Sequence, residues 1–355
     1  MPEAGLEGEL AISLDWDGRR VRAARVASTR PARVAQVLVG KRAADAVALV
    51  PQLFSVCGRS QAVAAALACD RAAGIGADTA RRQKRSAQVD GEIAHEHFWR
   101  ILLDWPRAAG ESGDAALFAR IRARLPDWDA GRHDLAILLA EQILRAPLGV
   151  LEDPERFEDW LDAGESPLAR VLARLRTEAA ELDAPCVPLL PTITPGLAGV
   201  LARRLDADER FSGAPDWDGR PHETGARARL RARPLVAGTK PVLGRLAARL
   251  VELAELLNGE PAERMGATTI SRGDAIAWVE TARGLLTHRV TLDGETIARY
   301  QIVAPTEWNF HPRGALAVEL AALRAADRAQ LGRRVELLVQ SLDPCVAWGV
   351  EVGHA

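Results

Sequence analysis

Apolar and polar positions along this chain predict mainly helices, with short strands near its two ends. Near the N-terminus, residues 10–14 and 21–26 are predicted to be strands, and Asp17-Gly18 supplies the turn residues of a hairpin between them. Three more strands are predicted in the last third of the chain, over residues 274–281, 286–292 and 296–303.

Helical patterns fill most of the remaining sequence. The helix predicted over residues 60–73 has Ser60 as its N-cap and Gly74 as its stop. The longest pattern covers residues 78–104 and is polar at first, then apolar. The other helices are predicted over residues 31–39, 115–125, 134–145, 167–181, 242–257, 314–326 and 329–340. Residues 206–234 are rich in Gly, Pro and Arg with little periodicity, which predicts a long surface loop or an internal joint.

Length and composition exclude several classes of function. The chain has 355 residues, 48% of them hydrophobic, which is enough for a large core and, by length alone, for two or three domains. Its formal charge of -2 gives no electrostatic reason to expect a nucleic-acid or membrane partner. We see no secretory signal and no apolar stretch near the roughly 20 residues that span a bilayer. Four cysteines in such a chain do not make a disulfide framework, so we expect a soluble cytoplasmic protein with reduced thiols.

Two cysteines stand in short phrases that could each hold a pair of thiols. Cys57 lies in LFSVCGRS and Cys345 in SLDPCVAW, and the residues three places on are Ser60 and Trp348. Cys57 directly precedes a predicted helix, whose N-terminus would lower the pKa of the thiol and favour the thiolate that binds a soft metal. The alternative for each cysteine, taken alone, is a small and inert core residue.

The other candidate residues are less specific. Cys69 is predicted to be a core residue and Cys186 a buried loop residue, neither of them a metal ligand. Every histidine, including His288, is interpreted as solvated or singly hydrogen-bonded. Arg283 and Thr306 lie at strand ends, where in a pocket they could donate hydrogen bonds to an anionic or nitrile-like ligand. The alternative is a surface arginine and a turn threonine.

Several phrases, in this order, resemble the large subunit of nickel–iron hydrogenases. That family carries RxCGxC near the N-terminus, a stretch similar to E-x-P-R-G-x-L-x-H, then Y-Q-x-x-x-P-[ST]-x-W-N-x-x-P-R, and DPCxxC near the C-terminus. The matching phrases here are VCGRS, ETARGLLTH, YQIVAPTEWNFHPR and SLDPCVAW. The opening LEGELAISLDWDGRRVRAA also resembles the N-terminal hairpin of the family. The resemblance covers residues 5–105 and 270–350.

The resemblance implies roles for residues of this chain. In the family, four thiolates hold nickel, and two of them also bridge to an iron that carries two cyanides and one carbon monoxide. Ser60 and Trp348 replace the bridging thiolates, so a nickel–iron site is not expected, whereas Cys57 and Cys345 match the nickel-only positions. Arg283 and Thr306 match the residues that donate hydrogen bonds to the cyanides. This combination resembles the HupK/HoxV-type hydrogenase assembly proteins.

The resemblance also implies a fold. We expect a single, mainly α, large-subunit-like domain with a central helical bundle, an N-terminal β-hairpin and a small antiparallel sheet in the C-terminal third. Its parts would be residues 1–105 with the hairpin and the Cys57 helix, a helical middle over 106–265, and the strands and Cys345 segment over 266–355. Cys57 and Cys345 should become neighbours.

Three hypotheses for the function follow. The first is a non-catalytic scaffold that transiently holds the iron–dicyanide–carbonyl unit at Cys57 and Cys345, without nickel, and passes it to the hydrogenase large subunit. The second is an interaction protein that imitates the large subunit and binds no metal. The third is an enzyme of altered chemistry, for which no acid–base constellation is present. The expected partners are hydrogenase maturation proteins and the hydrogenase large or small subunit.

Overall fold

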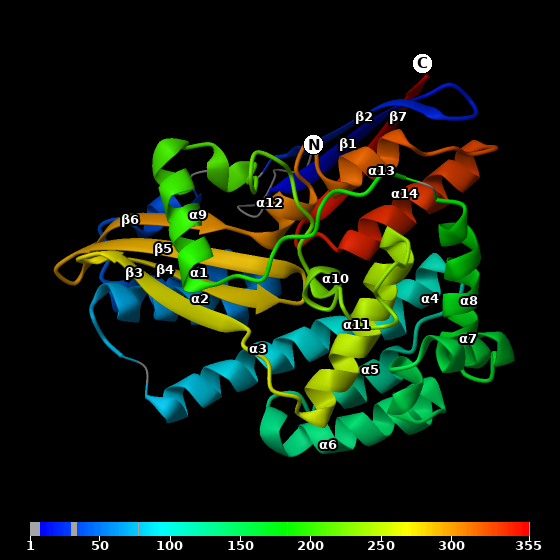
Figure 1. The fold of residues 1–355 in the computed structure, drawn as a ribbon, viewed down its shortest axis with the longest axis horizontal. Coiled ribbons are helices and arrows are strands. Elements are labelled where there is room, and N and C mark those ends of the chain that lie inside the picture. Colours follow the sequence, from blue (N-terminus) through cyan, green and yellow to red (C-terminus); the bar gives the residue numbers. More distant parts are fainter. Residues whose placement is uncertain (1–7, 30–33, 77, 183, 355) are drawn as a thin grey trace.

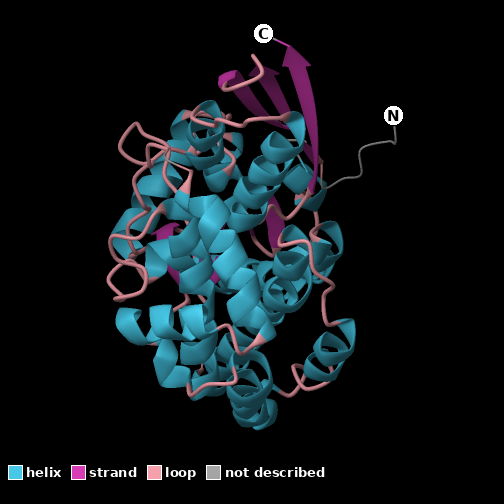
Figure 2. Ribbon diagram, turned by 90° about the vertical axis from the view of Figure 1, so that its right-hand side faces the viewer, coloured by secondary structure: helices cyan, strands magenta, loops and turns pink. Residues whose placement is uncertain are grey.

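The structure is mostly helical and contains two separate β-sheets, one of which lies at an edge of the molecule beside the C-terminus (Figures 1 and 2). The computed structural model describes residues 8–29, 34–76, 78–182 and 184–354. The strands are β1 (Glu9–Trp16), β2 (Val21–Ser28), β3 (Met265–Ser271), β4 (Asp274–Thr281), β5 (Gly284–Asp293), β6 (Thr296–Val303) and β7 (Ala347–His354). The helices are α1 (Ala43–Leu53), α2 (Gly58–Ala72), α3 (Thr79–Trp99), α4 (Trp105–Ala108), α5 (Ala115–Arg122), α6 (Trp128–Leu138), α7 (Pro154–Ala163), α8 (Pro167–Ala180), α9 (Pro195–Ala207), α10 (Ala226–Arg229), α11 (Pro241–Asn258), α12 (Pro305–Asn309), α13 (Ala315–Ala321) and α14 (Arg328–Leu342).

The predicted N-terminal hairpin is present and belongs to a three-stranded sheet. Side chains of β1 alternate between exposed and buried, so that one face of the strand joins the core. Asp17 stabilises the turn, since its carboxylate accepts hydrogen bonds from the backbone N–H groups of Arg19 and Arg20, at 2.9 Å each. On its other edge, β1 pairs in parallel with β7, a strand that was not predicted. The end of the chain therefore returns to the N-terminal hairpin, and Cys345 lies just before β7.

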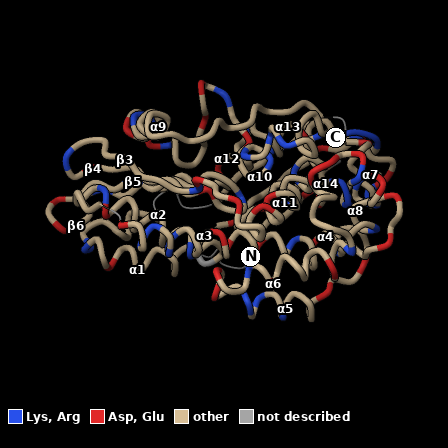
Figure 3. Tube along the Cα trace, turned by 60° about the horizontal axis from the view of Figure 1, so that its bottom comes forward, with Lys and Arg blue, Asp and Glu red and all other residues tan. Residues whose placement is uncertain are grey.

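The second sheet is antiparallel, in the order β3-β4-β5-β6, and carries helices on both faces. Helix α2 packs on one face and α9 on the other (Figure 3). Because both faces are covered, every residue of β4 is buried. The predicted strands over 274–281 and 296–303 coincide with β4 and β6. β3, at the edge of the sheet, was not predicted.

The helical part agrees with most of the predicted helices and adds others. Helix α3 continues through a π-helical turn, Arg100–Asp104, into α4, and α11 crosses it close to the centre of the structure (Figure 1). Helices α1, α7 and α9 were not predicted, and the predicted loop over 206–234 contains the short α10. Of the helix predicted over 31–39, Val34–Leu38 forms a 3-10 helix and residues 31–33 lie outside the described residues. No described helix combines the length and apolarity needed to cross a bilayer.

Candidate functional site

Cys57 is the N-cap residue of α2, in the short segment that follows α1. Ser60 was predicted to be the N-cap, but it lies in the first turn of the helix. Glu92 of α3 caps this turn, because its carboxylate accepts hydrogen bonds from the backbone N–H groups of Arg59 (2.8 Å) and Ser60 (2.9 Å). The prediction for Ser60 was wrong because the cap comes from another helix.

The pKa of the Cys57 thiol is raised in the structure, whereas the sequence predicted a lowered pKa. Burial raises the pKa of Cys57, and the neighbouring Cys345 and Glu92 raise it further. The prediction of a lowered pKa was wrong for two reasons. Cys57 is 7% exposed, and a carboxylate already occupies the anion-binding position at this helix N-terminus. Both effects favour the thiol form of Cys57 over its thiolate.

Cys345 is positioned by an aspartate that ends α14. Asp343 has a left-handed backbone, with φ of 60°, and closes the helix. Its buried carboxylate lies 2.9 Å from Arg100 Nη2 and 3.3 Å from Arg283 Nη2. Burial alone would raise the pKa of Asp343, but Arg100, Arg283 and Arg249 outweigh it and lower the pKa. The Asp-Pro-Cys turn is thus fixed by charge as well as by the proline.

Arg283 lies in the tight turn between β4 and β5. The turn depends on Gly284, whose φ is +128°; a Cβ there would lie 2.4 Å from Thr224 Cγ2. Arg283 Nη2 lies 2.7 Å from Glu96 Oε2, in addition to its contact with Asp343. Burial alone would lower the pKa of Arg283, but Asp343 and Glu96 outweigh it and raise the pKa. The Nε–H of this guanidinium is buried and has no hydrogen-bond partner among the described residues.

These residues meet at one small cavity. Cys57, Cys345 and Arg283 line it together with Gln61 and others, as the resemblance implies for the two thiols and the arginine. Its volume of about 10 Å³ has room for about one water molecule. Within the described part of the chain, no cluster of three or more His, Cys, Asp or Glu residues is placed to hold a metal ion. The candidate site is thus a buried pair of thiols beside a guanidinium.

Thr306 adjoins this cavity through Cys345. It lies in the first turn of α12, and its Oγ1 is 2.9 Å from Cys345 Sγ. The Cys345 backbone N–H also donates to Thr306 Oγ1, at 3.4 Å. The hydroxyl assigned to a cyanide is therefore a hydrogen-bond partner of the second thiol in this structure.

The two positions that lack the bridging thiols have structural roles. The Ser60 hydroxyl is within hydrogen-bond distance of Glu92, and its side chain is fully buried. Trp348 lies in β7 opposite Leu10 of β1 and packs against the main core. Neither residue lines the thiol cavity.

A buried hydrogen-bond chain reaches Cys57 from the second sheet, through residues that the sequence did not indicate. Tyr300 Oη lies 2.8 Å from His288 Nδ1, and His288 Nε2 lies 2.8 Å from Gln61 Oε1. The Gln61 amide nitrogen is 3.6 Å from Cys57 Sγ. His288 is thus buried with two hydrogen bonds, contrary to the interpretation of the histidines.

Tyr300, the residue farthest from Cys57 in this series, sets the direction of the hydrogen bonds. Among the described residues, Tyr300 has no acceptor for its buried O–H other than His288 Nδ1. Nε2 of His288 then carries the proton and donates to Gln61, so the Gln61 amide turns its N–H groups toward Cys57. The series of hydrogen bonds therefore presents the Gln61 amide N–H as a donor to the Cys57 sulfur.

The remaining cysteines take no part in the site. Cys69 is a buried residue of α2, as predicted. Cys186 is exposed, so its prediction as a buried residue was wrong. It lies in an irregular segment that leaves its side chain at the surface.

The fold is that of nickel–iron hydrogenase large subunits. Its structure is similar to a nickel–iron–selenium hydrogenase from Desulfovibrio vulgaris Hildenborough, with a TM-score of 0.59 and 16% identity over 93% of this chain and 94% of the other. It is also similar to the nickel–iron–selenium hydrogenase from Desulfomicrobium baculatum, with a TM-score of 0.57 and 16% identity over 94% and 95% of the two chains. The family model for nickel-dependent hydrogenases matches residues 240–351.

Curated relatives narrow this class. The chain is 35% identical to the hydrogenase expression/formation protein HoxV of Cupriavidus necator, over 93% of each chain. It is 31% identical to HupV of Azotobacter chroococcum, over 99% of this chain and 100% of the relative, and 30% identical to HupK of Azotobacter vinelandii, over the same shares. The chain belongs to this HoxV/HupK/HupV family of hydrogenase expression/formation proteins.

Proposed function

We propose that this chain is a non-catalytic assembly factor of nickel–iron hydrogenase maturation. It would hold the iron–dicyanide–carbonyl unit as a transient cargo and pass it to the hydrogenase large subunit. The observation that carries the proposal is the Arg283 Nε–H, a buried donor without a partner among the described residues, on a side chain that lines the cavity together with both thiols. An unpaired buried donor is costly, and a cyanide nitrogen is an acceptor that would satisfy it.

The two cysteines supply the metal chemistry of this proposal. Cys57 and Cys345 would each lose a proton to solvent and form one sulfur–iron bond, since thiolates suit a soft low-spin iron. The iron keeps its carbon monoxide and cyanides, no electrons are transferred, and nickel takes no part. Because these cysteines match the nickel-only positions, the iron would sit displaced toward the nickel position of the enzyme.

The size of the cavity means that loading requires movement. Iron with three diatomic ligands is much larger than the single water for which the cavity has room. Phe54, Val56 and Gln61 line the cavity along with the thiols, and Val56 is partly exposed at the protein surface. A shift of the short segment between α1 and α2 would widen the cavity from the outside.

The same small cavity favours a second candidate function. A protein that imitates the large subunit only to bind maturation partners needs no room for cargo, and the raised pKa of Cys57 disfavours its thiolate. In that case Cys57 and Cys345 would be core residues.

Infrared spectroscopy separates the two candidates. The protein would be purified without oxygen from cells that express the hydrogenase maturation genes, and its carbon monoxide and cyanide bands compared with its iron content. We expect both bands in the wild-type chain and in Cys69→Ala, a buried cysteine outside the cavity, but in neither Cys57→Ala nor Cys345→Ala. Absent bands in well-expressed wild-type protein would favour the metal-free interaction protein, and bands kept in both single variants would reject the ligand assignment.

A further inference from the structure

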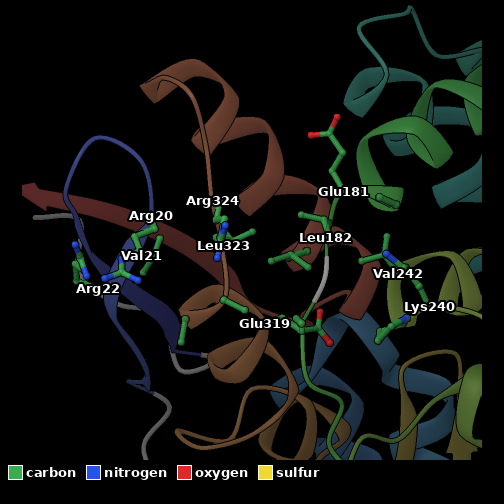
Figure 4. Close-up of a pocket in the computed structure, with 16 residues that line it drawn as sticks. Arg20, Val21, Arg22, Glu181, Leu182, Lys240, Val242, Glu319, Leu323 and Arg324 are labelled. Carbon is green, nitrogen blue, oxygen red and sulfur yellow. The ribbon is translucent and has the colours of Figure 1, made fainter.

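A second and much larger cavity lies away from the thiols (Figure 4). Its volume is about 740 Å³, within the usual range of ligand-binding cavities. Its walls come from the start of β2, the end of α8, the start of α11, the end of α13 with the segment after it, and α14. Its apolar lining includes Val21, Leu182, Val242, Leu323 and Leu338. It shares no lining residue with the thiol cavity.

The acidic residues of this cavity, Glu319 and Glu181, are each paired with an arginine from outside it. Glu319 is bound by the buried Arg245, with contacts of 2.9 and 2.5 Å. Glu181 pairs with Arg334, which is also buried. Neither arginine lines the cavity, and each also binds a second carboxylate, Glu223 for Arg245 and Glu178 for Arg334. The negative charge of Glu319 and Glu181 is therefore reduced but not cancelled.

The basic residues are not neutralised in this way. Arg20 and Arg22 share one carboxylate, that of Asp17. Lys240 Nζ donates to the backbone oxygen of Ala180 at 2.8 Å, and within the described residues neither Lys240 nor Arg324 makes an ion pair. The rim is therefore positively charged, although the whole chain has a formal charge of -2.

The arrangement of these cations distinguishes between kinds of anion. Figure 4 shows Arg20 and Arg22 on the β2 side of the cavity, Lys240 on the opposite side, and Arg324 between them. A phosphate group is bound by donors that converge on one point, whereas these side chains stand apart along an apolar floor. Separate carboxylates that alternate with apolar groups fit this pattern better.

The backbone of the cavity also limits how an occupant binds. Beside the cavity, the start of β2 is already hydrogen-bonded to the segment after α13, since Val21 N–H donates to Leu323 O and Ala325 N–H donates to Arg19 O, both at 2.9 Å. A bound segment would therefore not extend the sheet as a further strand. Recognition would depend on its side chains.

We propose that this cavity is a docking site for an acidic, partly apolar peptide segment of a partner protein. Carboxylates of the segment would pair with Arg20, Arg22, Lys240 and Arg324, and its apolar side chains would cover the floor. The proposal rests on the proposed role of the chain as an assembly factor, which must meet other proteins. The proposal adds that the partner carries an acidic segment with apolar side chains.

Labelled peptides test the proposal directly. Fifteen-residue peptides that tile the hydrogenase large subunit of the same host would be titrated with the full chain by fluorescence anisotropy. We expect acidic peptides to bind, more weakly as salt is added, and about tenfold or more weakly to the double variant Lys240→Glu/Arg324→Glu. The double variant Lys84→Glu/Arg122→Glu, which makes the same change of charge on exposed positions elsewhere, should bind like the wild type. Thermal unfolding checks that both variants are folded.

Other results would overturn the docking proposal. These are binding that ignores the reversal at Lys240 and Arg324, a preference for neutral or basic peptides, no peptide binding at all, or binding of inorganic phosphate in place of peptides. The infrared experiment is independent of this one. A chain without carbon monoxide and cyanide bands that still binds acidic peptides would reject the cargo role and leave the docking site standing.

Discussion

The Thr306 hydroxyl lies 2.9 Å from the sulfur of Cys345, and the backbone N–H of Cys345 donates to the same oxygen. Thr306 therefore positions the second thiol of the site. We predict that Thr306→Val lowers the free energy of unfolding by about 1–3 kcal/mol, because it removes a buried hydrogen-bonding group while keeping the shape of the side chain.

Thr287 provides the matched control. It is also a buried threonine, but its hydroxyl has no hydrogen-bond partner among the described residues. Thr287→Val should therefore be neutral or stabilising. Urea unfolding of both variants measures the difference, and an equal loss of stability in the two would contradict the role given to Thr306.

The turn that presents Arg283 should be sensitive to a single methyl group. Gly284→Ala combines an unfavourable φ of +128° with a Cβ only 2.4 Å from Thr224, so we expect it to cost more than about 2 kcal/mol of unfolding free energy. Gly294 is the control, because its φ is +59° and no atom lies within 4 Å of an added Cβ. Gly294→Ala should cost only the backbone term of about 1–2 kcal/mol. Equal unfolding midpoints in urea would show that the Thr224 contact yields easily.

The sequence predicted those elements whose structure depends on residues close together in the chain. The hairpin of β1 and β2 and the strands β4 and β6 were predicted because turn residues between short apolar runs specify them. β7 was missed because its partner β1 lies at the other end of the chain, and no local pattern reports such a pairing. The N-cap of α2 was misassigned for a similar reason, since Glu92 comes from another helix.

The site was predictable only in part. Their sequence context, together with the resemblance, led to Cys57, Cys345 and Arg283, and the structure places all three at one cavity. Their roles toward a metal stay a prediction. The acidity of Cys57 was predicted with the wrong sign, because burial and the placement of Glu92 depend on packing. Nothing in the sequence pointed to Gln61 and His288, because the hydrogen bond between them forms only once α2 lies against the second sheet.

His288 should make stability depend on pH. Burial lowers the pKa of His288 to about 3, from an ordinary value of about 6.5. As the pH falls below about 6.5, the unfolded chain takes up a proton that the folded chain refuses. The stability contributed by neutral His288 is therefore complete above pH 6.5 and is lost toward pH 3, at up to about 1.4 kcal/mol per pH unit.

Comparison with His288→Gln isolates this contribution. Glutamine cannot titrate, so the variant should lack this part of the slope. Some slope will remain, because the pKa of His97 is lowered by burial as well. Urea unfolding at pH 7, 6 and 5 gives the free energies, and parallel curves for the wild type and the variant would contradict the prediction.

Arg283 should be irreplaceable by lysine for holding the iron unit. Its guanidinium contacts Glu96 and Asp343 through Nη2 and keeps a separate Nε–H without a partner among the described residues, whereas lysine has a single nitrogen for all three tasks. In a background where the wild type carries carbon monoxide and cyanide bands, we predict that Arg283→Lys loses most of its iron and its bands. Arg264→Lys is the matched control, because Arg264 is also buried, pairs with Asp90 at 3.3 Å and has an Nε without a partner among the described residues, but lies outside the thiol cavity. Iron per chain and band intensity measure the outcome. Full iron with unshifted cyanide bands in Arg283→Lys would show that the Arg283 Nε–H is not the cyanide donor.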